Sequence, residues 1–287
     1  MATPIALRVL EGHARAYRHT WRGTTIGAVL TPVLFLAAMG LGLGSLVDDR
    51  TDPVLGGLSY LTWLAPGLLA ASAMQAGAAD GTFPVLGGTR WVGTYHTAVA
   101  SPVRPRDLHL GNLLWAAIRV TVIGTVFVLV AAAAGALPLA RGLLALGPAI
   151  LTGLAFCAAL SAGVVLLTSD QFLAGLQRFV VVPLFLFSGT FFPVEQLPPA
   201  AAAVARLLPL WHGVELTRAV ALGTPPALAW PVHLAVVVAL LVAGLIAGAR
   251  TFDRRLRPGP ASAARRRCWA GPPGWWSATS SPTVARG

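Results

Sequence analysis

The chain has 287 residues, of which 56% are hydrophobic and only 11% are charged, and its mean hydropathy is +0.72. A soluble domain carries about 25% charged residues, so this chain has too few polar groups to cover a water-facing surface. We therefore predict an all-α membrane protein. The formal net charge of +11 comes from arginine alone, because the sequence contains no lysine. That excludes phosphate-loop, Schiff-base and general-base chemistry that depends on lysine.

The first segment, residues 1–23, has the pattern of an amphipathic helix. At about 100° per residue its charged side chains fall within an arc of about 80°; these are Arg8, Glu11, Arg15, Arg18 and Arg22. The pattern predicts a helix that lies on the cytoplasmic surface of the membrane. The alternative is a basic leader that is merely solvated.

Residues 24–250 contain six apolar runs, and about 20 such residues are needed to cross the ~30 Å hydrocarbon core. The predicted spans are Thr24–Val47, Leu58–Ala79, Leu110–Leu137, Leu143–Thr168, Phe179–Pro193 and Trp230–Ala249. Twelve arginines flank these spans on the side of the N-terminus and four on the opposite side. Because cytoplasmic loops carry the excess of basic residues, we predict that both termini are cytoplasmic. The net charge then reflects topology, and we expect no nucleic-acid partner.

The connection between the second and third spans, Asp80–Asn112, is longer than a simple connector requires. It is rich in glycine and carries Arg90, Trp91 and Tyr95, with both aromatic residues expected at the surface. Since Trp, Tyr and Arg often anchor protein interfaces, this loop is predicted to dock a cytoplasmic partner. A connector adsorbed to lipid is the alternative.

Ionisable residues within spans are candidate functional groups. Arg119 lies about one third of the way into the third span, where it either extends to the lipid headgroups or lines a substrate path. We expect no acidic residue at mid-membrane, and hence no proton relay that would couple transport to an ion gradient. His212, Glu215 and His233 are interpreted as interfacial residues.

The fifth span is short, with 15 residues between Arg178 and Val194. Gly189 and Pro193 are predicted to end it. An apolar helical stripe formed by Val204, Leu207, Leu208 and Trp211 follows; Pro209 interrupts it, and it resumes around "WHGVELTRAV". We therefore predict an external hairpin that re-enters the outer leaflet. Glu195 would lie at the corner of this hairpin. It either favours the start of the short helix after Pro193 through that helix's N-terminal partial charge, or it holds the hairpin in place by pairing with Arg206 or Arg218.

The last segment, residues 251–287, is rich in arginine, proline, glycine and serine without apolar periodicity. Such a composition cannot bury a core, so we predict a disordered cytoplasmic tail. Arg265–Arg267 and the neighbouring tryptophans either bind anionic lipid or have no function.

Three features together resemble the permease subunits of ABC type-2 exporters: the six spans, the loop after the second span, and "LFSGTFFPVEQLP" followed by "LLPLWHGVELTRA". Within that group, "APGLLAASAMQAGAADGTF" is similar to nodulation lipo-oligosaccharide exporter permeases and related drug-export permeases. The resemblance covers about residues 5–255. Relatives commonly carry glutamate where Asp80 stands.

The resemblance implies a homodimeric or paired permease that moves an amphipathic substrate out across the plasma membrane: a lipid-linked saccharide, a lipid or a hydrophobic drug. Such a chain has no cofactor and no catalytic residue of its own, and a separately encoded ATP-binding subunit supplies ATP hydrolysis. The loop with Asp80, Arg90, Trp91 and Tyr95 would couple to that subunit. The hairpin would shape the outer exit through Gly189, Phe191, Pro193, Glu195, Arg206 and Trp211.

Two other classes of protein fit the composition. A membrane-bound transferase acting on lipids would require clustered acids, which we do not find in the sequence. A secondary carrier would transport without any ATPase.

Overall fold

The computed structural model describes residues 5–38, 42 and 57–256, and in this part of the chain all regular structure is helical. The long helices are α1 (Ile5–Ala38), α3 (Tyr60–Leu86), α5 (Pro105–Ala133), α6 (Leu139–Val164) and α11 (Trp230–Leu256). The shorter ones are η3 (Gly87–Trp91), α4 (Thr94–Val99), α7 (Asp170–Leu176), η4 (Gln177–Val181), α8 (Val182–Phe187), η5 (Val194–Gln196), α9 (Pro199–Leu207) and α10 (Pro209–Leu222).

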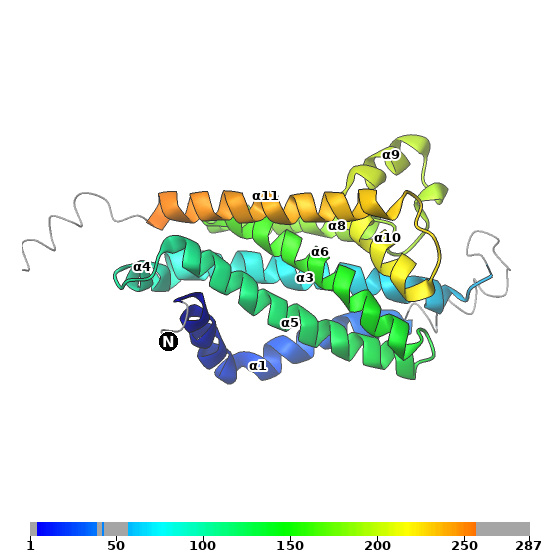
Figure 1. The fold of residues 1–287 in the computed structure, drawn as a ribbon, viewed down its shortest axis with the longest axis horizontal. Helices are drawn as coiled ribbons and strands as arrows, with labels where there is room; N and C mark the ends of the chain where they lie inside the picture. Colours follow the sequence, from blue (N-terminus) through cyan, green and yellow to red (C-terminus); the bar gives the residue numbers. More distant parts are fainter. Residues whose placement is uncertain (1–4, 39–41, 43–56, 257–287) are drawn as a thin grey trace, which may run out of the picture.

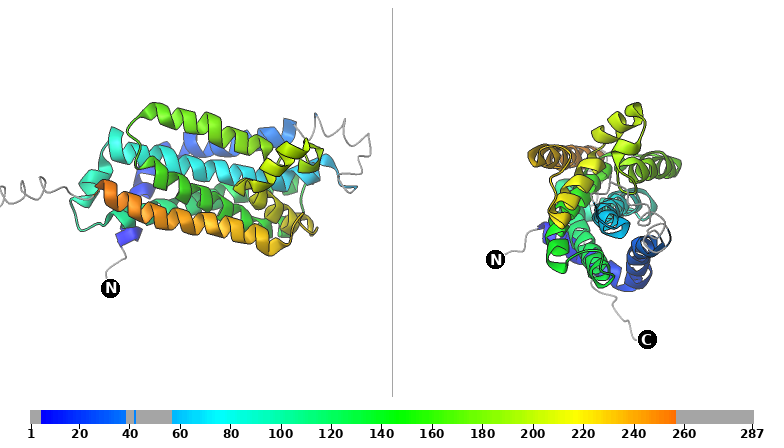
Figure 2. Two further views of the ribbon diagram at one scale, coloured as in Figure 1. Left: turned by 90° about the horizontal axis from the view of Figure 1, so that it is seen from above. Right: turned by 90° about the vertical axis from the view of Figure 1, so that its right-hand side faces the viewer.

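The long helices form an elongated bundle. Helices α3, α5, α6 and α11 run along its length, with α4 at one end and α9 and α10 at the other (Figure 1). We call these the α4 end and the α9 end. In the end-on view α3 lies near the centre, between α1, α11 and the helical segment Asp170–Phe187, which comprises α7, η4 and α8 (Figure 2). The first turns of α1 lie at the α4 end.

Helix α3 is the most enclosed element because it packs against α5, α6 and α10. It begins at Ser59, whose side-chain oxygen accepts a hydrogen bond from the Thr62 amide at 3.3 Å, an arrangement that satisfies one free N–H at a helix start. Pro66 and Pro84 lie within the helix without ending it. Its buried side chains are mostly small, which lets neighbouring backbones approach closely.

The closest approach is between α3 and α6. A Cβ atom at Gly77 would collide with the carbonyl oxygen of Gly153, and one at Gly81 would lie 2.6 Å from the carbonyl oxygen of Cys157. A Cβ at Gly153 would in turn lie 2.6 Å from the Ala73 carbonyl oxygen. Small residues at helix contacts are typical of membrane proteins, where packing rather than hydrophobic exclusion holds helices together.

Four described helical segments are long and apolar enough to cross a membrane: Pro105–Ala133, Leu139–Val164, Asp170–Phe187 and Trp230–Leu256. They match the third to sixth predicted spans. The first two predicted spans fall on α1 and α3, which are helical but do not meet the same apolar criterion. The chain is therefore a helical membrane protein, and the count of six spans stays a prediction.

Two predicted boundaries are wrong. The predicted inner loop begins inside α3, which continues to Leu86 and is followed by η3 and α4; glycine and proline in this stretch made a helix look like a loop. The fifth span begins at Asp170 rather than Phe179 and ends at Phe187. It ends before Gly189, whose positive φ of 71° favours glycine, and Pro193 does not terminate it.

The predicted break of the apolar stripe at Pro209 is confirmed, because helix α9 ends at Leu207 and α10 begins at Pro209. The four residues of the stripe do not share one environment. Val204 and Leu207 are exposed, whereas Trp211 is buried. Residues 257–287 of the predicted tail, and residues 39–41 and 43–47 of the first predicted span, lie outside the described residues. Residues 251–256 belong to α11.

Because α6 lies close to α3 along one face only, replacing glycine by alanine should have opposite effects on protein stability at two positions of α6. Gly153→Ala should destabilise the protein by about 1–3 kcal/mol, because the new methyl group is forced against the α3 backbone. Gly147→Ala should be neutral or stabilising, because nothing lies within 4 Å of its Cβ position and alanine favours helix over glycine. Thermal unfolding in detergent measures both. Equal unfolding midpoints for the two variants would contradict the packing described.

Candidate functional site

The bundle encloses an ion pair between Asp80 on α3 and Arg119 on α5. Asp80 is only 1% exposed, and the guanidinium of Arg119 donates to its Oδ1 atom. Arg119 also lies 5.6 Å from the centre of the Tyr17 ring on α1, within range of a cation–π contact. Three helices thus meet at one charged pair.

These positions correct the prediction for Asp80 and narrow the one for Arg119. Asp80 is not in a loop but within a helix, and it is an acidic residue buried among predicted spans, where none was expected. The guanidinium of Arg119 binds Asp80 and lines a cavity, an arrangement that favours the second of the two alternatives given for this residue. The absence of a buried acid therefore cannot serve as an argument against a secondary carrier.

Several polar atoms beside the ion pair lack a hydrogen-bond partner in the described part of the protein. Asp80 Oδ2 and Arg119 Nε are among them, as is the Oδ1 atom of Asn112. Asn112 donates through Nδ2 to the Asp80 carbonyl oxygen at 3.1 Å. Because burying an unpaired polar group costs free energy, the pair is well suited to contact water or a polar ligand.

A cavity of about 240 Å³ opens beside this pair. Its wall is mixed: Arg119, Gln75, Gln177, Ser72 and Thr31 are polar, and the remaining lining residues are Gly27, Phe35, Leu68, Ala76, Ala79 and Phe185. The two phenylalanines face each other edge to face at 6.4 Å. Such a cavity can accept a group that is polar on one side and apolar on the other.

At the α4 end, Arg90 and Trp91 of η3 bind the first residue of α7. Arg90 Nη1 donates to Asp170 Oδ1 at 2.9 Å, and Trp91 Nε1 donates to Asp170 Oδ2 at 3.1 Å. Arg90 and Trp91, adjacent in the chain, thus share one partner, and Trp91 is exposed; their role in docking a cytoplasmic partner stays a prediction. Asp170 was not singled out from the sequence, because its partners lie about 80 residues away.

Tyr95 differs from the prediction because it is buried rather than exposed. Its ring packs against Phe252 of α11 at 6.1 Å. Burial raises the pKa of the Tyr95 phenol, so the side chain stays neutral at physiological pH. Tyr95 therefore anchors α4 to the bundle, and it does not belong to a surface shared with Trp91.

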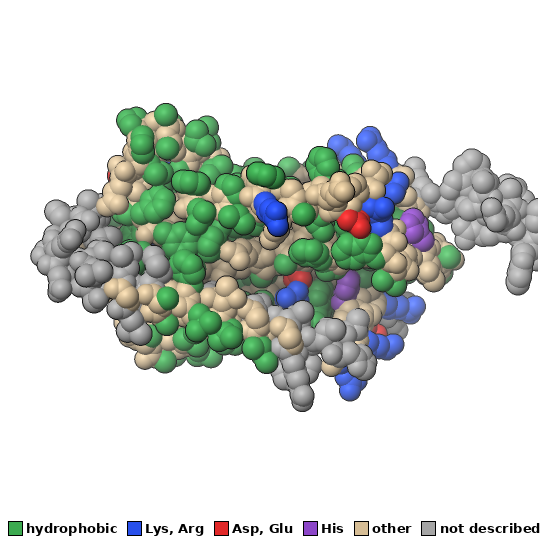
Figure 3. All heavy atoms as spheres, turned by 180° about the vertical axis from the view of Figure 1, so that it is seen from behind, with side chains coloured by type: hydrophobic (Ala, Val, Ile, Leu, Met, Phe, Trp, Pro, Cys, Tyr) green, Lys and Arg blue, Asp and Glu red, His purple; other side chains and the backbone are tan. Residues whose placement is uncertain are grey.

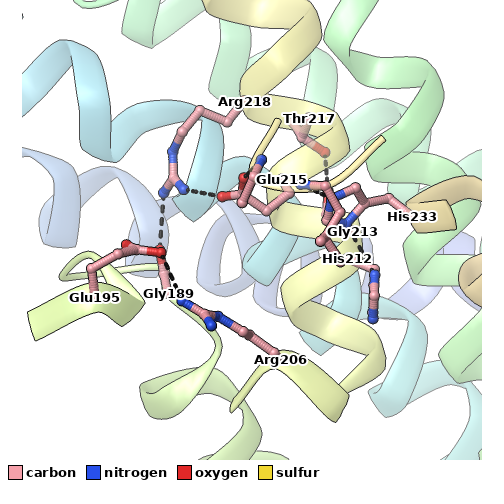
Figure 4. Close-up of polar contacts among 11 residues, drawn as sticks. Gly189, Glu195, Arg206, His212, Gly213, Glu215, Thr217, Arg218 and His233 are labelled. Carbon is pink, nitrogen blue, oxygen red and sulfur yellow. Dashed lines mark hydrogen bonds and ion pairs between the residues drawn. The ribbon is translucent and has the colours of Figure 1, made fainter. Parts of the chain in front are cut away.

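At the α9 end, Arg218 of α10 joins three segments (Figure 4). It donates to Glu215 Oε1 at 2.8 Å and to the Gly189 carbonyl oxygen at 2.9 Å, and its guanidinium lies 4.0 Å from the centre of the Trp63 ring. Glu215 accepts a further hydrogen bond from the Ala227 amide. Tyr60 also donates to the Phe191 carbonyl oxygen at 2.9 Å. The turn after α8 is thereby fixed to α3 and α10.

Glu195 pairs with Arg206 rather than with Arg218. The nitrogen and oxygen atoms are 3.5 Å apart and both side chains are about half exposed, 56% and 50%. Pro193 precedes η5, and Trp211 packs with Val194 beneath it. Of the two arginines proposed as partners of Glu195, the structure thus selects the exposed one.

His212 and His233 form a buried contact between α10 and α11, with their Nδ1 atoms 2.9 Å apart. The Leu228 amide donates to His233 Nε2 at 3.3 Å, so a neutral His233 carries its proton on Nδ1 and donates to His212. Burial lowers the pKa of His212, and the neighbouring His233 lowers it further. A backbone hydrogen bond with Arg206 and the negative charge of Glu215 raise the pKa in part. Both histidines are buried within the protein, and their position at the membrane interface stays a prediction.

Taken together, the described elements define a class of protein: a multi-pass helical membrane protein with an ion pair and a mixed cavity inside its bundle. Comparison with known proteins narrows that class. The model of the ABC-2 type transporter family matches residues 11–222, and this chain belongs to that family.

Individual relatives are similar over most of their length. Nodulation protein J of Rhizobium meliloti (strain 1021) is 33% identical over 210 residues, which is 73% of this chain and 78% of the relative. Nodulation protein J of Rhizobium leguminosarum bv. viciae is 31% identical over 250 residues, which is 87% of this chain and 94% of the relative. The resemblance inferred from the sequence motifs is confirmed at the level of the family.

The Asp80–Arg119 pair predicts a strong coupling between two substitutions. Asp80→Ala should destabilise the protein by up to about 3–5 kcal/mol, because it leaves Arg119 without its counter-ion. Adding Arg119→Leu should recover most of that loss. The control is Glu11→Gln, which removes an exposed ion pair with Arg15 and should cost less than about 1 kcal/mol. Additive effects in the double variant, measured by thermal unfolding, would contradict the pairing.

The two ion pairs of the α9 end should differ in importance. Glu215→Gln should be clearly destabilising, because the Glu215 and Arg218 side chains are only 13% and 11% exposed and a buried arginine would lose its counter-ion. Glu195→Gln should cost at most about 1 kcal/mol, because its pair with Arg206 faces solvent. Chemical or thermal unfolding of both variants tests this order, and the reverse order would refute it.

Proposed function

We propose that this chain is the membrane subunit of an ATP-driven exporter, and that ATP is hydrolysed on a separately encoded subunit. The observation that carries the proposal is the cavity beside Asp80 and Arg119. It lies among the helices proposed to cross the membrane and combines hydrogen-bonding groups with aromatic and aliphatic walls. An amphipathic molecule can satisfy both kinds of wall as it passes.

The proposed topology has six spans with both ends in the cytoplasm. The spans are the second half of α1, then α3, α5, α6, Asp170–Phe187 and α11. Basic side chains gather at the α4 end (Figure 3), which supports placing that end in the cytoplasm. The first half of α1 would then lie along the inner surface, and α9 and α10 would form the external hairpin, set into the outer leaflet.

The proposed substrate is amphipathic: a lipid-linked saccharide, a lipid or a hydrophobic drug. The charges of Asp80 and Arg119 cancel, so this pair and the amide and hydroxyl groups near it suit a polar headgroup without net charge. Phe35 and Phe185 suit the apolar part of the substrate. The relatives named above are nodulation proteins. Together with the sequence resemblance to nodulation lipo-oligosaccharide exporter permeases, this supports the saccharide alternative. We further propose that two copies, or two related permeases, form the unit in the plasma membrane.

Reconstitution tests whether transport depends on an ATPase. Proteoliposomes should hold the chain alone or with the ATP-binding subunit encoded nearest its gene, and a fluorescent lipid-linked saccharide and a hydrophobic dye should serve as probes. We expect ATP-dependent movement of at least one probe only when both subunits are present. Equal movement without the ATPase, or movement driven by a pH gradient, would favour a secondary carrier and overturn the proposal.

A further inference from the structure

Arg90 and Trp91 form a small carboxylate-binding site at the α4 end. Each supplies one N–H group, and the two groups bind the two oxygens of one carboxylate, that of Asp170. An arginine is well suited to bind a carboxylate, and the indole N–H, which can only donate, completes the pair of contacts. The Arg90–Trp91 site therefore recognises an acidic side chain, and Asp170 of the same chain fills it.

The contact is exposed enough to be exchanged. The side chains of Arg90 and Asp170 are 34% and 56% exposed, and Trp91 is exposed as well. Ion pairs in such positions contribute little to stability because solvent screens them and both side chains lose freedom. A contact of this kind is better suited to reversible binding than to stabilising the fold.

Asp170 begins the helical segment that packs most loosely in the bundle. Only 11% of the apolar window in Asp170–Phe187 is buried, against 22–44% for the other three candidate spans. Near the α4 end, Leu173 packs beside Val85 and Leu86, so the apolar contact between α7 and the end of α3 is small. Further along, Gln177 and Phe185 of the same segment line the cavity. A shift of this segment would therefore change the cavity wall.

The surroundings of the site favour an acidic partner. The start of α5 and the end of α11 both lie at the α4 end (Figure 1) and carry the exposed arginines Arg104, Arg106, Arg250, Arg254 and Arg255. A surface with this charge attracts a partner of opposite charge. A carboxylate of such a partner would meet both donors of the Arg90–Trp91 site and compete with Asp170.

We infer that Asp170 occupies the Arg90–Trp91 site in the absence of the ATP-binding subunit, and that an acidic side chain of that subunit replaces it on docking. The exchange releases α7 and allows Gln177 and Phe185 to move at the cavity. The identity of the partner rests on the proposed function; the tie between η3 and α7 does not.

The first part of the test uses the full chain alone in lipid nanodiscs and needs no partner. Asp170→Asn removes the charge but keeps the size of the side chain. Amide hydrogen exchange should become faster in residues 170–176 and remain unchanged in α5 and α6. Glu11→Gln, which removes an exposed ion pair of α1, should leave 170–176 unchanged. Unaltered exchange at 170–176 in Asp170→Asn would overturn the tie, whatever the partner.

The second part measures binding of the ATP-binding subunit encoded nearest the gene. Asp170→Asn should tighten binding by about two- to fivefold, because a weak internal competitor is removed. The exchanged pair Arg90→Glu/Asp170→Arg restores an internal ion pair but offers the partner a carboxylate, so binding should fall at least fivefold. Two results would overturn the proposal that Asp170 and the subunit compete for one site. One is weaker binding of the subunit by Asp170→Asn, and the other is unchanged binding by Arg90→Glu/Asp170→Arg. If the unaltered chain does not bind the subunit at all, the proposed function is contradicted instead. The hydrogen-exchange measurement on the chain alone still decides whether Asp170 holds α7 to η3.

Discussion

The burial of a carboxylate inside α3 is the constraint on which the central part of the structure depends. Asp80 lies in the most enclosed helix of the bundle, and an isolated charge there would be very costly. Arg119 on α5 supplies the counter-ion, and Tyr17 on α1 packs against that arginine. The pair thus sets where three helices meet. Its hydrogen bonds are incompletely satisfied, and Arg119 lines the neighbouring cavity.

The two sides of α3 have different mechanical characters. Toward α6 the contact is close, because glycine at positions 77 and 153 brings the backbones together, and this side forms a rigid frame. Toward Asp170–Phe187 the packing is loose, and polar contacts tie the ends of the segment: Asp170 to Arg90 and Trp91, and the turn after Phe187 to Arg218. A cavity between a rigid wall and a loosely held wall can change shape without unfolding the bundle.

The α9 end is held by buried polar groups rather than by an apolar core alone. Arg218 is bound by Glu215, by the Gly189 carbonyl oxygen and by the face of Trp63, so one side chain connects α10, the turn after α8 and α3. The histidine contact joins α10 to α11 nearby. The exposed Glu195–Arg206 pair lies outside this network. The segment from the turn after α8 to α10 is therefore fixed by buried contacts, and its solvent-facing charges contribute less.

The sequence by itself determined the class of the protein, its helical nature and its family. Composition excluded a soluble domain, and the motifs around Phe185–Pro198 and Leu207–Ala219 indicated the family that the comparisons confirmed. It also brought out Arg90, Trp91, Glu195 and Arg119 as residues of interest. The environment of Asp80, the burial of Tyr95 and the partner of Asp170 were decided only by the tertiary structure. Glycine and proline concealed the continuation of α3, because helix packing tolerates them where local propensity does not. Contacts such as Arg119 with Asp80 and Arg90 with Asp170 join residues 39 and 80 positions apart, and no local pattern encodes them because they depend on how whole helices pack.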